Sequence, residues 1–203
     1  MSLSQLAGAS YLNPIRLARA QNGAGAEGQL PSDLAAYNRN GQVFCAANVS
    51  AKSVIAVTTV MTGVILYNPP NSGKNLLIAD VGFVWTTAPA AVHNIGLAFA
   101  APHLTIPATV TAIGSGVLQA DGSGNAGGSI TLAYDAATLP VAPVATLWFG
   151  GAAYGTGVGE SPYSILVKIN GARMLKPGAV MTFAAVTTTA VGMGHVTWVE
   201  VPV

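Results

Sequence analysis

Residues 74–86, KNLLIADVGFVWT, carry the pattern that decides the fold. From residue 77 on, the odd positions are all apolar: Leu77, Ala79, Val81, Phe83 and Trp85. The even positions between them include Asp80, Gly82 and Thr86. An apolar side chain at every second residue is typical of a strand with one face in the core and the other in water. We therefore predict a half-buried antiparallel strand here.

The same two-residue period recurs along the chain, for example over 129–134 and 163–170. Turn sequences separate the candidate strands: Asn68–Gly73, Asp121–Asn125, Asn170-Gly171 and Lys176–Gly178. The pattern predicts strands near 43–49, 53–60, 63–68, 75–86, 93–99, 109–119, 128–134, 144–149, 163–170, 179–187 and 194–201. Many short strands without intervening helices favour a sandwich or barrel. We predict an all-β, antiparallel, jelly-roll-like β-sandwich domain over residues 41–203.

Residues 1–40 differ in character, and we predict that they form an N-terminal arm, partly extended and partly helical. Asn13 before Pro14 is typical of a helix start, and Gly23–Gly28 has the composition of a flexible linker. A second weak helical element follows over 30–40. A solvated tail would not need the apolar side chains of this arm, so we predict that it docks on a neighbouring subunit instead of on its own domain. The candidate interaction residues are Leu12, Ile15, Arg16, Leu17, Arg19, Leu30, Leu34 and Tyr37.

The chain is unusually poor in charge. Eight basic and seven acidic residues make up 7% of 203 positions, and the formal net charge is +1. An ordinary globular protein has about 25% charged residues. Without a field of one sign we expect no nucleic-acid partner. The scarcity of acids and bases also argues against an enzyme, and it favours surfaces that contact other protein subunits.

A membrane segment is not expected. The longest uncharged stretch, Val81–Ala120, is interrupted by three prolines, which leaves Pro177–Val199 as the only serious candidate. Its run of threonines followed by Gly192, Gly194 and His195 favours two strands and a turn. Met1–Ser10 lacks the basic flank and apolar run of a secretory signal. Cys45 has no second cysteine to pair with, and we expect a small buried hydrophobe.

Two sequences resemble metal- or phosphate-binding loops without completing them. Asn71–Lys74 lacks the earlier glycine of a P-loop and the Ser or Thr after the lysine, so we predict a hairpin loop. Asp121–Asn125 lacks the central glycine and the closing glutamate of a calcium loop, so we predict a turn. We also interpret the sequon Asn48–Ser50 as a chance match.

No complete catalytic or metal-binding set emerges from the remaining polar residues. His93, His103 and His195 are scattered along the chain. Ser161 lacks the second glycine of a nucleophile elbow, and a strand follows it instead of a helix. We predict no catalytic residues, no cofactor and no metal.

A sugar-stacking platform would need several exposed aromatic residues. Two of the three tryptophans, Trp85, Trp148 and Trp198, lie in strands with apolar neighbours, so burial is expected for them. Tyr154 in the glycine-rich stretch 150–159 is the one aromatic that we predict to be exposed. Such a stretch is more often packed at a subunit boundary than used as a ligand pocket.

Two longer stretches support a family resemblance. Residues 63–78, GVILYNPPNSGKNLLI, and the C-terminal residues 175–183 and 197–203 resemble small jelly-roll structural proteins of tailed-bacteriophage virions. The resemblance covers the body from about residue 41 and leaves the arm unmatched. It implies a protein of the virion, a homotrimer, and contacts with the major capsid protein or other virion proteins, with no catalytic residues.

These observations lead to one expectation and two alternatives. We expect a non-enzymatic virion component, with a capsid decoration or cement protein favoured. The first alternative is a tail-associated module that binds a receptor or a carbohydrate. The second is a hydrolase, which would need two carboxylates brought together by folding from Asp80, Asp121, Asp135, Glu160 and Glu200. The motifs leave open whether the protein serves the head or the tail.

Overall fold

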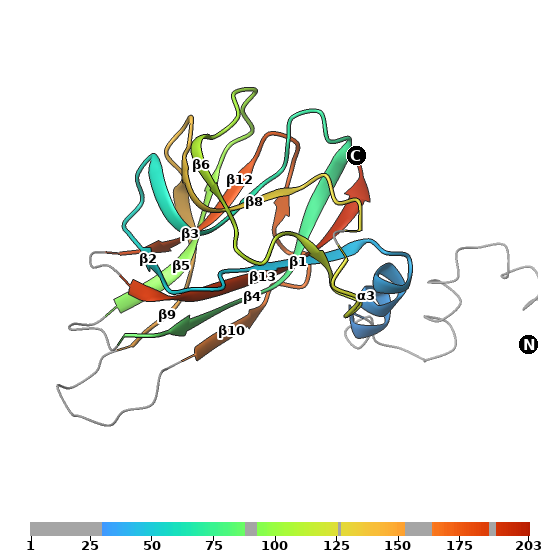
Figure 1. Ribbon diagram of the computed structural model, residues 1–203, viewed down its shortest axis with the longest axis horizontal. Coiled ribbons are helices and arrows are strands. Elements are labelled where there is room, and N and C mark those ends of the chain that lie inside the picture. The colour runs from blue at the N-terminus through green and yellow to red at the C-terminus, as the bar shows by residue number, and fades with distance from the viewer. Residues whose placement is uncertain (1–29, 88–92, 126, 153–163, 187–189) are drawn as a thin grey trace, which may run out of the picture.

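The computed structural model describes residues 30–87, 93–125, 127–152, 164–186 and 190–203. They form one α-helix and thirteen strands in two antiparallel sheets (Figure 1). The elements are α3 Leu30–Arg39, β1 Val43–Ala47, β2 Lys52–Val54, β3 Val60–Tyr67, β4 Lys74–Trp85, β5 His93–Ala100, β6 Ala108–Ala112, β7 Leu118–Gln119, β8 Leu132–Thr138, β9 Val144–Ala152, β10 Ser164–Lys168, β11 Met174–Leu175, β12 Val180–Ala185 and β13 Ala190–Pro202. This confirms the predicted all-β sandwich.

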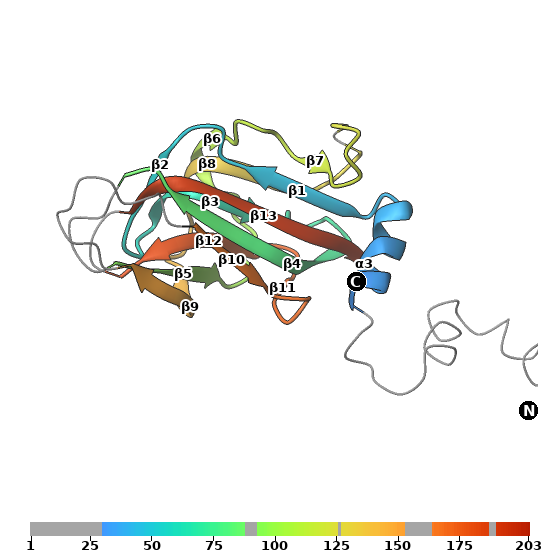
Figure 2. The same cartoon turned by 90° about the horizontal axis from the view of Figure 1, so that it is seen from below.

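The two sheets hold different strands in a fixed order. The seven-stranded sheet, sheet A, runs β10-β4-β13-β1-β7, with β11 pairing with β4 and β2 pairing with β13. The six-stranded sheet, sheet B, runs β6-β8-β3-β12-β5-β9. Figure 2 shows α3 against one end of sheet A, near the chain's C-terminus.

The main core lies between the sheets and is rich in aromatic rings. Phe83 of β4 contacts Trp85 edge-on with ring centroids 5.0 Å apart, and it meets Phe183 of β12 at 5.9 Å. Phe44 of β1 stacks on Trp198 of β13 at 6.2 Å. Trp85 and Trp198 are fully buried, as expected for tryptophans within apolar strands. These contacts across and within the sheets hold the sandwich together.

The decisive stretch 74–86 forms β4, but its pattern changes phase in the middle. Thr197 pairs with Asp80 and Trp198 pairs with Ile78, so Ala79 is an extra residue, a β-bulge. Before the bulge, the even residues Leu76 and Ile78 are fully buried. After it, the odd residues, such as Phe83, face the core. Leu77 therefore lies on the outer face of sheet A, not in the core as strict alternation from residue 77 would require.

Residues 68–73 do not form the predicted hairpin. They connect β3 in sheet B to β4 in sheet A, and these strands do not pair. Asn68 secures this connection from a fully buried position. Its side-chain amide donates hydrogen bonds to the carbonyl oxygens of Lys74 and Leu175, at 2.8 and 3.0 Å.

Several predicted strands differ from the observed ones in extent. The stretch 53–60 holds only β2 and the first residue of β3, and 109–119 is divided between β6 and β7. The stretch 128–134 begins its strand at Leu132, which is exposed, whereas Ala133 and Asp135 are buried. Ile130 and Leu132 are therefore not the core residues of β8. The turns at 170–171 and 177–178 are confirmed.

Pro177–Val199 contains β12 and most of β13, which confirms the prediction of two strands there. Within the described ranges, no helix is long and apolar enough to cross a bilayer.

Candidate interaction surfaces

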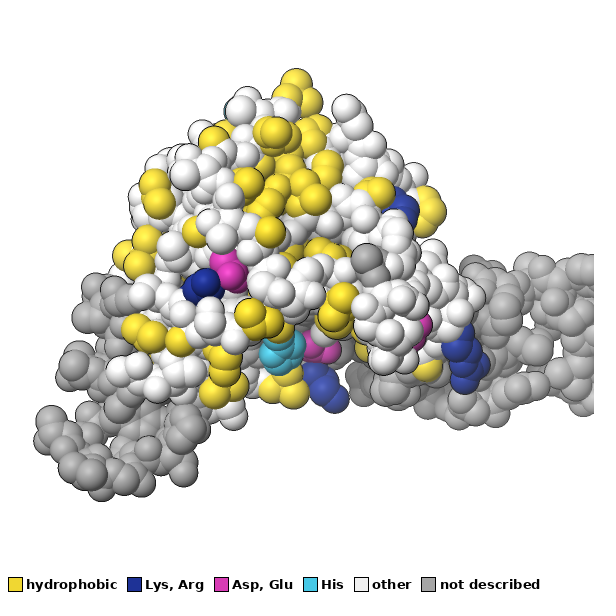
Figure 3. Space-filling model, viewed as in Figure 1, with side chains coloured by type: hydrophobic (Ala, Val, Ile, Leu, Met, Phe, Trp, Pro, Cys, Tyr) yellow, Lys and Arg dark blue, Asp and Glu magenta, His cyan; other side chains and the backbone are white. Residues whose placement is uncertain are grey.

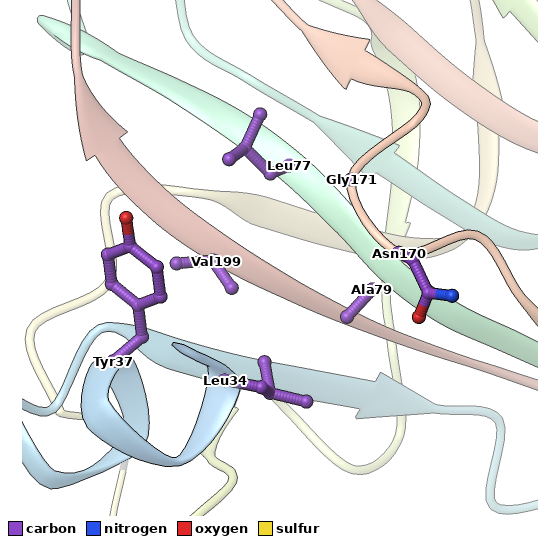
Figure 4. A pocket seen from close by; sticks show the side chains of 7 residues that line it. All are labelled: Leu34, Tyr37, Leu77, Ala79, Asn170, Gly171 and Val199. Carbon is purple, nitrogen blue, oxygen red and sulfur yellow. The ribbon is translucent and has the colours of Figure 1, made fainter. Parts of the chain in front are cut away.

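The first feature is an apolar cleft between α3 and the outer face of sheet A (Figure 4). Leu34 and Tyr37 reach over from α3, and the strands β4 and β13 supply the opposite side. The cleft encloses about 420 Å³, part of it open to solvent. Its lining residues are Leu34, Tyr37, Leu77, Ala79, Asn170, Gly171 and Val199. None of these carries a charge, so the cleft fits an apolar side chain.

The position of α3 corrects one prediction about the arm. Leu34 and Tyr37 pack against the sheet of their own chain, and Asn38 donates a hydrogen bond to the carbonyl oxygen of Ala120 at 3.2 Å. This part of the arm therefore lies against its own domain. It lines the cleft together with Leu77, which the β-bulge at Ala79 places on the outer face of sheet A. The candidate residues Leu12, Ile15, Arg16, Leu17 and Arg19 lie outside the described residues, and Leu30 begins α3.

The second feature is an apolar protrusion formed by residues 101–107, the connection between β5 and β6. Leu104 is 87% exposed and Ile106 is 64% exposed. The connection is nevertheless anchored, since the backbone N–H of His103 donates to the carbonyl oxygen of Gly178 at 3.1 Å. A Cβ at position 178 would lie 2.7 Å from the backbone oxygen of His103, so only glycine allows this contact.

Apolar exposure continues onto the neighbouring strands of sheet B. Val110 of β6 is 47% exposed and Leu132 of β8 is 45% exposed. Hydrophobic side chains gather in the upper part of Figure 3, where β6 and the connection before it lie. Exposed apolar side chains that gather on one part of a folded body are typical of an interaction site.

Trp148 on the edge strand β9 is an exposed aromatic that sequence reasoning did not identify. Its side chain lies over Gly96, where a Cβ would come within 2.7 Å of the indole. It remains 44% exposed. Tyr154, the aromatic that we predicted to be exposed, lies outside the described residues. Trp148 has apolar neighbours in sequence. Its side chain is exposed because β9 lies at the edge of sheet B.

A polar row crosses the outer face of sheet A. Thr197 of β13 lies in register between Cys45 of β1 and Asp80 of β4, and Asp80 pairs with Lys168 of β10. The imidazole of His195 lies 3.6 Å from the Asp80 carboxylate. Cys45 is only partly buried, not fully buried as expected.

The electrostatics of this row follow from its contacts. Burial is the largest influence on the Asp80 carboxyl and raises its pKa, but His195 and Thr197 as hydrogen-bond partners, with the charge of Lys168, lower the pKa overall. Burial, and then the charge of Asp80, raise the pKa of the Cys45 thiol. A thiol with a raised pKa is a poor nucleophile, so this row does not have the properties of a catalytic Cys–His pair.

Two acidic side chains, those of Glu200 and Asp135, form buried polar clusters inside the sandwich. Glu200 of β13 accepts hydrogen bonds from Ser129 and Thr131 at 2.6 and 2.7 Å, and it pairs with Lys74 at 2.7 Å. Burial, the largest influence, raises the pKa of Glu200, but these hydrogen bonds and the Lys74 charge lower it overall. The cluster ties the segment before β8 to sheet A.

Asp135 of β8 belongs to a second such cluster. It pairs with Lys52 at 3.0 Å and accepts a hydrogen bond from the Asn48 side chain at 2.6 Å. The backbone N–H of Gly194 donates to the Asn48 oxygen at 3.1 Å. Asn48 is 6% exposed, so the sequon does not present an accessible acceptor in the folded chain.

Within the part of the chain that the structure describes, the fold does not bring the other candidate catalytic and metal-binding residues together. Among the described residues, no group of three or more His, Cys, Asp or Glu side chains is placed to hold a metal ion. Asp121 accepts a hydrogen bond from the backbone N–H of Ser123 at 2.8 Å, which confirms the predicted turn. Glu160 and Ser161 lie outside the described residues, and His93 begins β5.

Comparison of this chain with protein-family models, with curated proteins and with solved structures finds no match.

Proposed function

We propose that the sandwich is a jelly roll. The support is the pairing of its eight principal strands, which in chain order are β1, β3, β4, β5, β9, β10, β12 and β13. The first pairs with the last, the second with the seventh, the third with the sixth and the fourth with the fifth. This is the pairing of one long hairpin rolled across two sheets, the arrangement found in capsid and lectin domains.

On this fold we propose a non-enzymatic structural component of a bacteriophage virion, with a capsid decoration or cement protein favoured. The observation that carries the proposal is the exposed apolar surface of a domain that is already folded: Leu104, Ile106, Val110 and Leu132. Interface cores are depleted of charge, and burying uncharged side chains avoids the cost of desolvating ions. The resemblance of residues 63–78 and of the C-terminus to virion proteins supports the same function.

The proposed partners are further copies of this chain, in a homotrimer, and the major capsid protein or another virion protein. Two of the seven acidic residues, Asp135 and Glu200, are buried in internal clusters. At most five of the seven acidic side chains therefore remain for the outer surface. A surface of this kind suits extensive dry contacts better than long-range recognition of nucleic acid or of an acidic ligand.

A density map of particles purified from the source of the chain tests the location. The expected result is the sandwich in regular copies on the particle shell, and the expected mass of the purified protein by light scattering is that of three chains. Absence of the chain from the particles contradicts the virion function. A monodisperse monomer at micromolar concentration contradicts the homotrimer.

Trp148 favours a second candidate function, a tail-associated module that binds a receptor or a carbohydrate. A partly exposed indole beside a glycine provides an aromatic surface on which a sugar ring can stack. This function predicts that the same density map shows copies of the chain at the tail tip. It also predicts that the purified protein binds a saccharide and that Trp148→Ala abolishes this binding. Shell copies without saccharide binding would exclude this candidate.

A further inference from the structure

The cleft and the protrusion are both costly to leave in water. The protrusion of residues 101–107 presents Leu104, almost fully exposed, on a connection that Gly178 holds in place. The cleft leaves Leu77 and Tyr37 partly open between α3 and sheet A. Neither feature has a partner among the residues that the structure describes.

The symmetry of a trimer relates the cleft and the protrusion. A two-fold contact joins the same surface on both copies, whereas a closed trimer joins two unlike surfaces that must be complementary. This chain offers one raised apolar surface and one hollow apolar surface. They lie on different sides of the molecule: the connection between β5 and β6 forms the top of Figure 1, and α3 lies at the right. A contact between them is therefore made between copies, not within one.

The chemistry of the two surfaces matches as well. The cleft lining contains no charged residue, and Asn170 supplies its one side-chain amide. The protrusion contains no acidic or basic residue besides His103, whose Nδ1 accepts a hydrogen bond from the backbone N–H of Thr105. Placing Leu104 in the cleft would thus remove apolar surface from water on both sides without desolvating an ion.

We propose that Leu104 of one copy enters the cleft beside α3 of the next copy, and that three such contacts close a ring. This inference rests on the proposed homotrimer and names the two surfaces that build it. It assigns α3 a role in assembly although it packs on its own domain, because Leu34 and Tyr37 form one wall of the cleft.

The first experiment measures the mass of the full-length protein by light scattering. Leu104→Asp removes the apolar tip, and Leu34→Glu places a charge in the cleft. Each is expected to change the mass from three chains to one. Leu166→Asp is the matched control, since Leu166 is 63% exposed on β10 and belongs neither to the lining of the cleft nor to the protrusion. The control is expected to keep the mass of three chains.

A second experiment does not depend on how Leu34→Glu affects α3. In a Cys45→Ser background, which removes the native cysteine, Leu104→Cys and Leu34→Cys are combined in one chain. A disulfide requires Cα atoms within about 7 Å, so oxidation is expected to yield a covalent trimer that a reductant dissolves. Leu166→Cys with Leu34→Cys is expected to yield none.

The outcomes separate the inference from the proposed function. A wild-type trimer that both charged variants leave intact, without a covalent trimer from the cysteine pair, overturns the inference and leaves the virion function standing. That result would assign the cleft to another occupant, such as the N-terminal residues or a different virion protein. A wild-type monomer overturns the homotrimer and the inference together.

Discussion

The buried carboxylate of Glu200 shows most clearly how this chain uses its few charged side chains. Glu200 is 1% exposed, yet every contact it makes is polar: two hydroxyl groups on one oxygen and the Lys74 ammonium on the other. A buried carboxylate is tolerated only when its lone pairs are occupied in this way. Glu200 thus fixes the segment before β8 to β13 and does not serve as a reactive group.

Glu200→Gln is expected to destabilise the fold by about 2 kcal/mol at pH 7, because the amide cannot accept from both hydroxyl groups and also pair with Lys74. The folded pKa of Glu200 is lowered, so its contribution is present above the unfolded pKa of about 4.3 and is lost as pH falls through the folded pKa. Urea unfolding at several pH values measures this. The difference from the native chain should be largest near neutral pH and should shrink in acid.

Asp121→Asn is the matched control, since Asp121 is exposed and asparagine also forms the turn that it caps. It should change the unfolding free energy by less than about 0.5 kcal/mol. Equal stability of Glu200→Gln and the native chain at pH 7, or a difference that persists unchanged at pH 3, would contradict this account of the cluster.

Among the secondary-structure elements, β4 shows why one extra residue matters. The bulge at Ala79 lets Leu76 and Ile78 point inward on one side of it, while Val81, Phe83 and Trp85 do so on the other. The carbonyl oxygen of Ala79 also accepts from the backbone N–H groups of Ile169 and Asn170, both at 2.8 Å. The bulge residue therefore takes part in the contacts of β4 with β13 and with the residues that follow β10.

Deleting Ala79 is expected to cost about 2 kcal/mol, because it removes the carbonyl oxygen that accepts hydrogen bonds from the backbone N–H groups of Ile169 and Asn170. The inward side chains of β4 should keep their places, since Ile78 and Asp80 then lie opposite Trp198 and Thr197 in unbroken alternation. Urea unfolding or a thermal transition measures the loss. Deleting Ser123 shortens the chain equally in an exposed turn and should have a much smaller effect. A chain without Ala79 as stable as the one without Ser123 would show that the Ala79 carbonyl does not stabilise the connection that follows β10.

Local patterns predicted the strands but not their phase or their sheet. Alternation indicated β4 and β10. The position of the extra residue in β4, however, depends on the pairing of β4 with β13, which lies more than a hundred residues later in the chain. Asn68–Gly73 has the same turn residues whether it joins paired strands or crosses between sheets, so the predicted hairpin was wrong. Trp148 could not be identified as exposed because exposure depends on the edge position of β9.

At the scale of the whole molecule, the structure moves the boundary of the arm. Residues 1–40 were predicted as one arm, but α3 contacts β1 and lines a cleft together with Leu77 and Val199 of sheet A. The backbone N–H of Gln42 bonds to the carbonyl oxygen of Tyr37 at 3.0 Å, so α3 leads directly into β1. Among the described residues, the helix behaves as part of the folded body.

Two truncations therefore differ in their expected effects. Removing residues 1–29 keeps α3 and should change the unfolding free energy by less than about 0.5 kcal/mol. Removing residues 1–40 deletes the helix that forms one wall of the cleft and breaks the hydrogen bond from Asn38 to Ala120. It should leave the sandwich folded, by its circular dichroism, but less stable by about 2 kcal/mol. Equal stability of the two truncated chains would mean that α3 contributes nothing to the body, and its only role would then be in contacts with other copies.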